Sequence, residues 1–267
     1  MWDAIIITPF INVILFIYSF MGQNFGIAII LFTIIIRLIT HPLMVKQIKG
    51  AQGMQNMQND EEWKKVQEKF KGDKEKLAQE QMKYYKEKGI NPFASCLPTL
   101  IQFPIIIALY QSIIASLAAT PVEVLNLVRH VYPGFLDVST LIPLNSQFLW
   151  MDLGQPERLN LPFLSFGIPI LAILVVISTY VQSKLIQPPS ANPKDQSAMM
   201  GNMMNIYMPF FMGYLALTLA SGLSLYFLVS NLLGIAQYAM LGKVNWKNLI
   251  PGAKPNKPAA ISTKRKK

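Results

Sequence analysis

Residues 25–45 read FGIAIILFTIIIRLITHPLMV, an apolar run with one charge, Arg37. The run meets the requirement of about 20 residues for a helix that spans the bilayer core. An arginine within such a helix costs about 3 kcal/mol on insertion scales, so it normally faces a bundle interior or water. Thr33, Thr40 and His41 share its helix face. This polar stripe favours a polar interior over an arginine that only reaches toward the nearer headgroups.

The rest of the composition is also that of a membrane protein. The chain is 52% hydrophobic and 14% charged, against roughly 25% charged in soluble domains. A lone cysteine, Cys96, excludes a disulfide framework, and the apolar content excludes a disordered chain. We expect an all-α membrane protein with a core over 24–241, whose five transmembrane helices span 24–45, 92–118, 161–183, 204–220 and 223–241.

The distribution of basic residues predicts the orientation. Eleven Lys and Arg residues lie in 46–89 and eight in 242–267, whereas the loop 119–160 holds two. Because basic residues are enriched in cytoplasmic segments, the stretch 46–91 and the tail 242–267 are predicted to be cytoplasmic. The loop 119–160 is then extracytoplasmic, with the N-terminus outside and the C-terminus inside.

Residues 1–23 are predicted to form an interfacial amphipathic helix. Thr8, Asn12, Ser19 and Gln23 fall on one helix face, and large apolar residues occupy the other. Such a segment lies in the membrane plane. A sixth span and an uncleaved signal remain the alternatives, although no basic residue precedes the apolar run.

The stretch 46–91 is predicted to be a cytoplasmic helical hairpin. Its charges of both signs are interleaved, Gly72-Asp73 is its best turn signal, and Asn91-Pro92 closes it. Its sparse apolar side is formed by Val66, Phe70, Leu77, Met82 and Tyr85. A linker needs only a few residues, so the length favours a contact surface over a simple connection.

The spans carry their polar residues toward the cytoplasmic end. Gln102 lies near the start of the second span, Gln182 near the end of the third, and Asn231 in the inner half of the fifth. Together with Arg37 and its stripe, this pattern predicts a cavity open to the cytoplasm and closed to the outside.

Catalytic signatures are missing from the sequence. No Asp or Glu lies within the predicted spans, and no nucleophile elbow, phosphate-binding loop or zinc-protease motif occurs. The two histidines lie on opposite sides of the membrane, which disfavours a histidine metal site. We expect a protein that is not an enzyme, with no metal and no cofactor.

Four segments resemble one family of membrane proteins. They are FTIIIRLITHPL at 32–43, INPFASCLPTLIQFPIIIALYQSI at 90–113, FLWMDLG at 148–154 and SGLSLYFLVSNLLGIAQ at 221–237. In order and spacing they resemble the YidC-type membrane protein insertases of the Oxa/Alb superfamily, in a short form without the large extracytoplasmic domain. The resemblance covers nearly the whole chain.

The resemblance implies a function and a set of site residues. Five helices would enclose a hydrophilic groove that receives nascent membrane segments as a chaperone does and releases them into the bilayer. Arg37 matches the groove arginine and Gln182 another groove position, while Tyr226 and Phe227 match an aromatic pair at the substrate slide. Phe227 stands where other members carry Tyr or Trp. A bacterial plasma membrane, a monomer, the Sec translocon and the signal recognition particle pathway follow as further expectations.

The basic tail predicts contacts with polyanions. It contains no acidic residue, and it ends in Lys264, Arg265, Lys266 and Lys267. Such a segment binds anionic lipids or ribosomal RNA through its phosphates. The resemblance favours a ribosome contact shared with the hairpin. Two other functions stay open at this point: a small-solute secondary transporter, which would need inverted repeats and an ion site, and a membrane assembly scaffold, which would leave Arg37 unexplained.

Overall fold

The protein is almost entirely helical in its computed structural model, which describes residues 3–70, 72–89, 97–117, 120–134, 136, 141, 144–160, 167–186, 196–242, 244 and 246. A π-helical turn, η1 (Asp3–Ile7), leads into the first α-helix. The elements are α1 (Thr8–Phe20), α2 (Phe25–Asn59), α3 (Glu61–Lys69), α4 (Lys74–Glu87), α5 (Leu97–Ser116), α6 (Pro121–His130), strands β1 (Gln147–Phe148) and β2 (Met151–Asp152), α7 (Ile170–Ile186), α8 (Gln196–Thr218) and α9 (Ser221–Met240).

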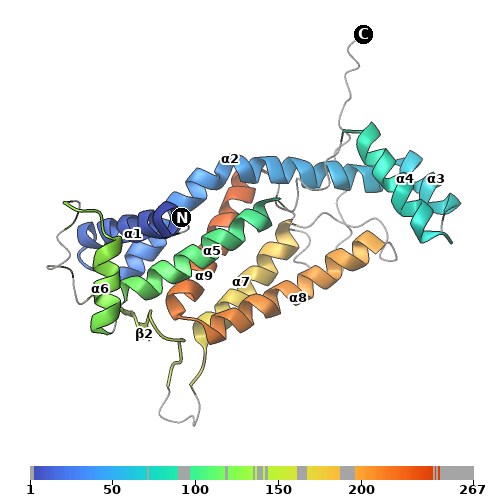
Figure 1. The fold of residues 1–267 in the computed structure, drawn as a ribbon. Coiled ribbons are helices and arrows are strands. Elements are labelled where there is room, and N and C mark those ends of the chain that lie inside the picture. The colour runs from blue at the N-terminus through green and yellow to red at the C-terminus, as the bar shows by residue number, and fades with distance from the viewer. Residues whose placement is uncertain are drawn as a thin grey trace.

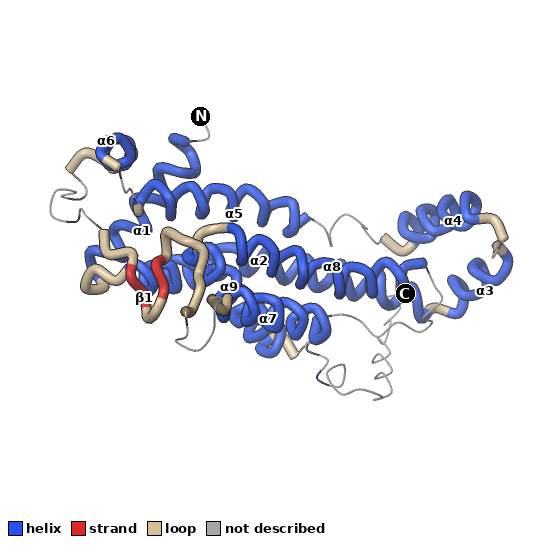
Figure 2. The backbone as a smooth tube through the Cα atoms, turned by 90° about the horizontal axis from the view of Figure 1, so that it is seen from below, coloured by secondary structure: helices blue, strands red, loops and turns tan. Residues whose placement is uncertain are grey.

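The long helices run between two ends of the molecule (Figure 1). The pair α3 and α4 lies at one end, and α6 and the two strands lie at the other, an arrangement that the second view confirms (Figure 2). Helix α9 packs against α2 and α7, and α8 packs against α7. The predicted all-helical class is therefore confirmed.

Length and hydropathy single out three candidate spans among the described residues: Asp3–Phe20, Phe25–Lys46 and Ser221–Met240. The apolar parts of α5, α7 and α8 are shorter, at Phe103–Ser116, Ile170–Leu185 and Ile206–Thr218. The count of five spans consequently stays a prediction.

Two helices differ from the predicted span limits because hydropathy marks the membrane and not the helix. Helix α2 does not stop at Val45 but runs on to Asn59, through lysine, glutamine and methionine residues that favour helices. Helix α7 begins at Ile170 rather than at 161, because Ile168 pairs with Leu159 in a β-bridge and precedes a proline, which disfavours helical backbone. The helices thus reach beyond or fall short of the apolar runs.

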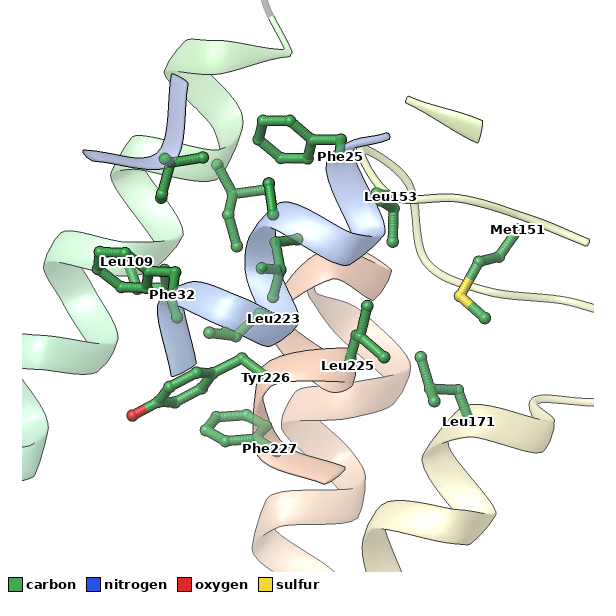
Figure 3. Close-up of a cluster of buried hydrophobic side chains, with 14 of the residues drawn as sticks. Phe25, Phe32, Leu109, Met151, Leu153, Leu171, Leu223, Leu225, Tyr226 and Phe227 are labelled. Carbon is green, nitrogen blue, oxygen red and sulfur yellow. The ribbon is translucent and has the colours of Figure 1, made fainter. Parts of the chain in front are cut away.

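The main core joins α1, α2, α5, α7 and α9 at the end that carries the strands. Phe25 and Phe32 of α2, Leu109 of α5, and Leu223 and Tyr226 of α9 are all nearly inaccessible, and Figure 3 shows their side chains together. Gly222 permits this close packing, since a Cβ atom there would lie 3.1 Å from the carbonyl oxygen of Leu153. The core therefore occupies the predicted extracytoplasmic half.

The segment around β1 and β2 binds the ends of three long helices. The Phe148 ring lies against Gly26 so closely that a side chain at residue 26 would collide with it. Ser221 Oγ donates to the carbonyl of Asp152 at 2.7 Å. The buried Glu157 accepts hydrogen bonds from the backbone N–H of Leu171 at 3.1 Å and from Trp150 Nε1 at 2.8 Å. We call residues 144–157 the outer cap.

Helix α1 does not present its whole polar face to water. Asn12 is 2% exposed, and its Nδ2 donates to the carbonyl of His130 at 2.7 Å while its Oδ1 accepts from the N–H of Tyr132 at 2.9 Å. Asn12 therefore joins α1 to the end of α6. The interfacial placement of residues 1–23 stays a prediction, with a sixth span and an uncleaved signal as its alternatives.

The hairpin of α3 and α4 packs around two aromatic rings that the predicted apolar side left out. Trp63 and Tyr84 are buried, with ring centroids 5.5 Å apart. Met82, by contrast, is 46% exposed, and it lies on the opposite side of α4 from Tyr84. The side chain of Asp73 caps α4 by accepting from the N–H of Lys76, as the turn signal at Gly72-Asp73 suggests.

Asp60 organises the junction between α2 and α3. Its side chain caps α3 by accepting from the N–H of Glu62 at 3.0 Å and also accepts from the hydroxyl of Tyr84. This second bond is the main reason why the pKa of Asp60 lies below its ordinary value of 3.8. Burial, together with the same bond, raises the pKa of Tyr84 to about 12.

We expect Tyr84→Phe to weaken this junction by about 1 kcal/mol, the usual net value of one hydrogen bond. The bond stabilises the folded state while Asp60 is ionised, so its contribution is present above pH 3.8 and is lost as the pH falls below that value. Amide hydrogen exchange of α3 and α4 in the full chain, at about pH 6 and about pH 3 and corrected for intrinsic rates, measures the difference.

Tyr85→Phe is the matched control. The Tyr85 hydroxyl accepts a hydrogen bond from Gln81 Nε2 at 3.1 Å, and no hydrogen bond joins it to a carboxylate in the described part of the chain. Its loss should affect the hairpin equally at both pH values. If the two variants show the same pH dependence, the Asp60–Tyr84 bond is not the acid-sensitive contact.

Candidate functional site

Arg37 lies between α2 and α9 and is held by a single residue of α9. Its Nε donates to Ser230 Oγ at 3.0 Å, and its Nη2 donates to the carbonyl oxygen of Ser230 at 2.7 Å and to Ser230 Oγ at 2.5 Å. Ser230 is 4% exposed. Among the described residues, none accepts a hydrogen bond from Nη1. The guanidinium is therefore anchored on one edge, and the other edge retains donors for a ligand or water.

Gln237 extends this contact by two turns along α9. Its Nε2 donates to the carbonyl oxygen of Arg37 at 3.2 Å and lies 3.5 Å from His41 Nδ1. Its buried Oε1 accepts no hydrogen bond within the described part of the chain. A buried amide oxygen without a donor is uncommon, and it leaves this site with an acceptor as well as the donors of Arg37.

Helix α7 reaches the same place through Gln182. A Cβ atom at Gly234 would collide with the Gln182 amide and would lie 3.6 Å from Arg37 Nη2. Gly234 is buried, so its missing side chain provides the space in which the amide of α7 approaches the guanidinium of α2. The structure thus brings Arg37 and Gln182 close to the same glycine, and their shared role in a groove stays a prediction.

Asn231 joins α9 to α7 on a neighbouring face. Its Nδ2 donates to Ser178 Oγ at 3.0 Å and to Thr179 Oγ1 at 2.8 Å. Both hydroxyl residues are buried. We call the whole group the intramembrane polar cluster: Arg37 and His41 of α2, Ser178, Thr179 and Gln182 of α7, and Ser230, Asn231 and Gln237 of α9.

The electrostatics of the cluster are dominated by one uncompensated charge. Helices α2, α5, α7, α8 and α9 contain no Asp or Glu. Within the described residues, the ion pairs all involve the hairpin, through Asp60, Glu62, Asp73 and Glu80. Arg37 is consequently a positive charge that has hydrogen bonds but no carboxylate partner. Such a site attracts anionic groups, because charges interact more strongly where water is scarce.

The two predicted threonines occupy less open positions. Thr33 is fully buried and donates to the carbonyl of Ile29 at 2.6 Å, and Thr40 donates to the carbonyl of Ile36 at 2.8 Å. Both hydroxyls thus bind their own helix. The side chain of Gln102 lies outside the described residues, as do Lys264, Arg265, Lys266 and Lys267.

The aromatic pair assigned to the substrate slide lies in the core. Tyr226 and Phe227 are 2% and 6% exposed, and their rings pack at a centroid distance of 5.8 Å (Figure 3). A client segment would reach them only if α9 separated from its neighbours. A role in sliding stays a prediction, and the burial of both rings differs from the exposed surface that the name implies.

Sequence reasoning did not single out Thr179 and Ser230 of the cluster, nor Gly234 beside it. Ser230 and Gly234 are small residues that no motif marks. Their spacing offers a signal, since Ser230, Gly234 and Gln237 recur at intervals of four and three along one face of α9. No group of three His, Cys, Asp or Glu residues that could hold a metal ion occurs in the described ranges.

Comparison with known proteins places this geometry in one family. The sequence model of the family described as 60Kd inner membrane protein matches residues 16–248. The chain is 34% identical to the membrane protein insertase MisCA of Bacillus subtilis over 240 residues, which cover 88% of this chain and 77% of that protein. It is 32% identical to the membrane protein insertase YidC 2 of Bacillus anthracis, with 90% of this chain and 80% of that protein covered.

A solved structure resembles the fold. The structure described as "Active YidC insertase crystal structure with the first transmembrane domain resolved" matches with a TM-score of 0.52 at 24% identity. The match covers 85% of this chain and 45% of that chain. The fold is therefore YidC-like, and this chain corresponds to somewhat less than half of that structure.

Ser230→Ala tests whether Ser230 anchors Arg37. The change removes the acceptor for Nε and one acceptor for Nη2, and hydrogen bonds to charged groups contribute about 1.5–3 kcal/mol. We expect a lower unfolding temperature of the purified protein in detergent. Thr218→Ala is the control, because the exposed Thr218 hydroxyl only binds its own helix through the carbonyl of Tyr214, and it should change stability by less than about 0.5 kcal/mol. Equal stability of both variants would contradict the anchoring role.

Proposed function

The chain belongs to the 60Kd inner membrane protein family and is a membrane protein insertase, and we propose that it receives its clients at the intramembrane polar cluster. The clients are nascent membrane proteins. The hydrophilic flank of a client segment would bind near Arg37, while its apolar part would leave along the helices into lipid. The observation that carries this proposal is Arg37 itself, a charge whose Nη1 edge binds no acceptor and which pairs with no carboxylate among the residues that the structure describes.

The energetic argument concerns the flank and not the apolar segment. An acidic residue at the centre of a membrane helix costs about 2.5–3.5 kcal/mol on insertion scales. Attraction to Arg37 and hydrogen bonds to the cluster offset part of this cost while the flank crosses the apolar region. The client segment then partitions into lipid by its own hydrophobicity, so no covalent step is needed.

The remaining predicted residues take supporting roles in the proposal. Gln182 offers an amide group near Arg37, Asn231 joins α9 to α7 on the neighbouring face, and Gln102 would line the same groove from α5. Thr33 and Thr40 shape the face of α2 on which Arg37 lies, since their hydroxyls are bonded to their own helix. Tyr226 and Phe227 would guide the apolar segment after α9 separates from its neighbours.

The proposed function also requires a defined orientation of the chain in the membrane. We infer a bacterial plasma membrane, with the N-terminus outside, the C-terminus in the cytoplasm, the hairpin inside and the outer cap outside. The distribution of basic residues supports this orientation. The apolar core and the outer cap would then close the outer half, and clients would enter from the cytoplasm. Ribosomes, the Sec translocon and the signal recognition particle pathway are the partners that fit this direction.

Arg37 should act through its charge. We expect Arg37→Ala to reduce insertion of a single-span client with an acidic flank on the order of tenfold, equivalent to about 1.4 kcal/mol, and Arg37→Lys to retain part of the activity. A client whose flank carries Asn and Gln instead should be affected less. Protease protection of the client in proteoliposomes measures insertion, and immunoblotting measures the abundance of each variant.

The neutral client serves as the internal control for this comparison. A purely packing role for Arg37 predicts lower abundance of Arg37→Ala and the same loss for both clients. Equal insertion of the acidic client by Arg37→Ala and the unchanged protein would rule out the electrostatic role.

The tail should contribute to ribosome binding. Deleting residues 254–267 removes Lys254, Lys257 and the last four basic residues. We expect weaker co-sedimentation with ribosomes and a shallower salt dependence, because fewer phosphate contacts release fewer counterions. Membrane integration of the protein itself should be unchanged. A truncated protein that co-sediments as well as the full chain at low salt would leave the tail with lipid or topology roles only.

A further inference from the structure

Helix α6 carries three large apolar side chains on one exposed face. Val122 is 68% exposed, Leu125 53% and Val128 46%. Their spacing of three residues places them on one side of the helix. Three exposed apolar residues on one face of a helix of ten residues form a surface that a protein in water rarely presents.

The opposite side of α6 is already packed against the protein. Leu127 is 1% exposed and Val131 9% exposed, and both join the cluster formed by Ile7, Ile11 and Leu15 of η1 and α1. The bonds from Asn12 to His130 and Tyr132 fix the end of the helix. The exposed apolar face is therefore a second apolar face, beyond the one that folding needs.

A narrow polar strip separates the two apolar faces on one side. Glu123, Asn126 and His130 recur at intervals of three and four residues, and the first two are exposed. A helix in water needs one apolar face, whereas a helix at a membrane surface that also packs on protein needs two. The pattern of α6 fits the second situation.

The orientation of α6 agrees with this pattern. The helix crosses the direction of α5 and the other long helices (Figure 1), and it is seen nearly end-on in the perpendicular view (Figure 2). It lies at the end of α5 farthest from the hairpin, directly after the apolar stretch Phe103–Ser116. If the long helices cross the bilayer, α6 runs in the plane of its outer surface.

Large exposed apolar side chains also occur on the segment against which α6 packs. Ile5 of η1 is 66% exposed, and Phe16 and Phe20 of α1 are 49% and 76% exposed. These residues belong to the segment on which α6 packs. Arg129 is exposed and falls between Val122 and Leu125 around the helix, where its guanidinium can reach lipid phosphates from an apolar face.

We propose that α6 is an interfacial helix whose face of Val122, Leu125 and Val128 inserts into the outer leaflet of the bilayer. The occupant of this face is lipid acyl chain at the headgroup boundary, and the strip of Glu123, Asn126 and His130 faces water. The Thr120–Glu123 capping box gives the helix a defined start at the membrane surface. The proposal depends on the chain's membrane location and is independent of how clients are bound.

Two nitroxide labels on adjacent residues test the proposal in the full chain. Leu125→Cys and Asn126→Cys are made in a Cys96→Ser background, and the proteins are reconstituted into vesicles of phosphatidylethanolamine and phosphatidylglycerol. Collision rates with molecular oxygen, which concentrates in lipid, and with a water-soluble nickel chelate are measured for each label. Both residues are exposed on the same helix, so the pair is matched for position and differs in face.

The proposal requires opposite results for the two labels. The label at residue 125 should collide severalfold more with oxygen than with the nickel chelate, and the label at residue 126 should show the reverse. Equal access of the nickel chelate to both labels would place the face in water and overturn the proposal. Protection of residue 125 from both reagents, or spin–spin broadening that dilution with unlabelled protein removes, would assign the face to a protein partner or a second copy and would also overturn it.

Discussion

A positive charge in the apolar part of α2 is the constraint on which the arrangement of the inner half depends. Arg37 needs hydrogen-bond acceptors, and α9 supplies them through Ser230. That bond determines which faces of α2 and α9 meet, and Gly234 then allows Gln182 of α7 to approach the same point. Since no acidic residue lies in these helices, the charge is held in place without being neutralised. The contact between Arg37 and Ser230 therefore both stabilises the packing of α2 on α9 and holds the positive charge in place.

The long helices are held together by different kinds of side-chain contact at different points along the bundle. Toward the outer cap, α2, α5, α7 and α9 meet through large apolar side chains, and residues 144–157 bind the helix ends through backbone and carboxylate contacts. Nearer the hairpin, α2, α7 and α9 meet through the hydroxyl, amide and guanidinium groups of the intramembrane polar cluster. Beyond that cluster, Met44 and Ile48 of α2 and Tyr238 of α9 form a small apolar cluster. Polar groups enclosed between apolar clusters can bind a hydrophilic group, which apolar packing excludes.

Local patterns predicted several features correctly, and long-range contacts account for the ones they missed. The helical class and the turn near Gly72 follow from hydropathy and turn residues, which act over a few positions. Burial of Tyr226 and Phe227 does not follow, because a helix that is apolar on most sides has no pattern to show which side meets protein and which meets lipid. The burial of Asn12 does not follow from a local pattern either. A polar residue needs hydrogen-bond partners, and here these partners are backbone groups of residues 130 and 132, which lie far away in the sequence.

By itself, the sequence determined that this is a helical membrane protein with a charge in an apolar helix, a charged stretch after it and a basic tail, because hydropathy and charge are properties of single residues. Only the tertiary structure decided which small residues matter. No motif in the sequence marks Ser230 or Gly234. They contribute to the site because α2 and α7 approach α9 at those positions. Likewise, the exposed apolar face of α6 can be recognised only once the structure shows that Leu127 and Val131, on the other face, pack against η1 and α1.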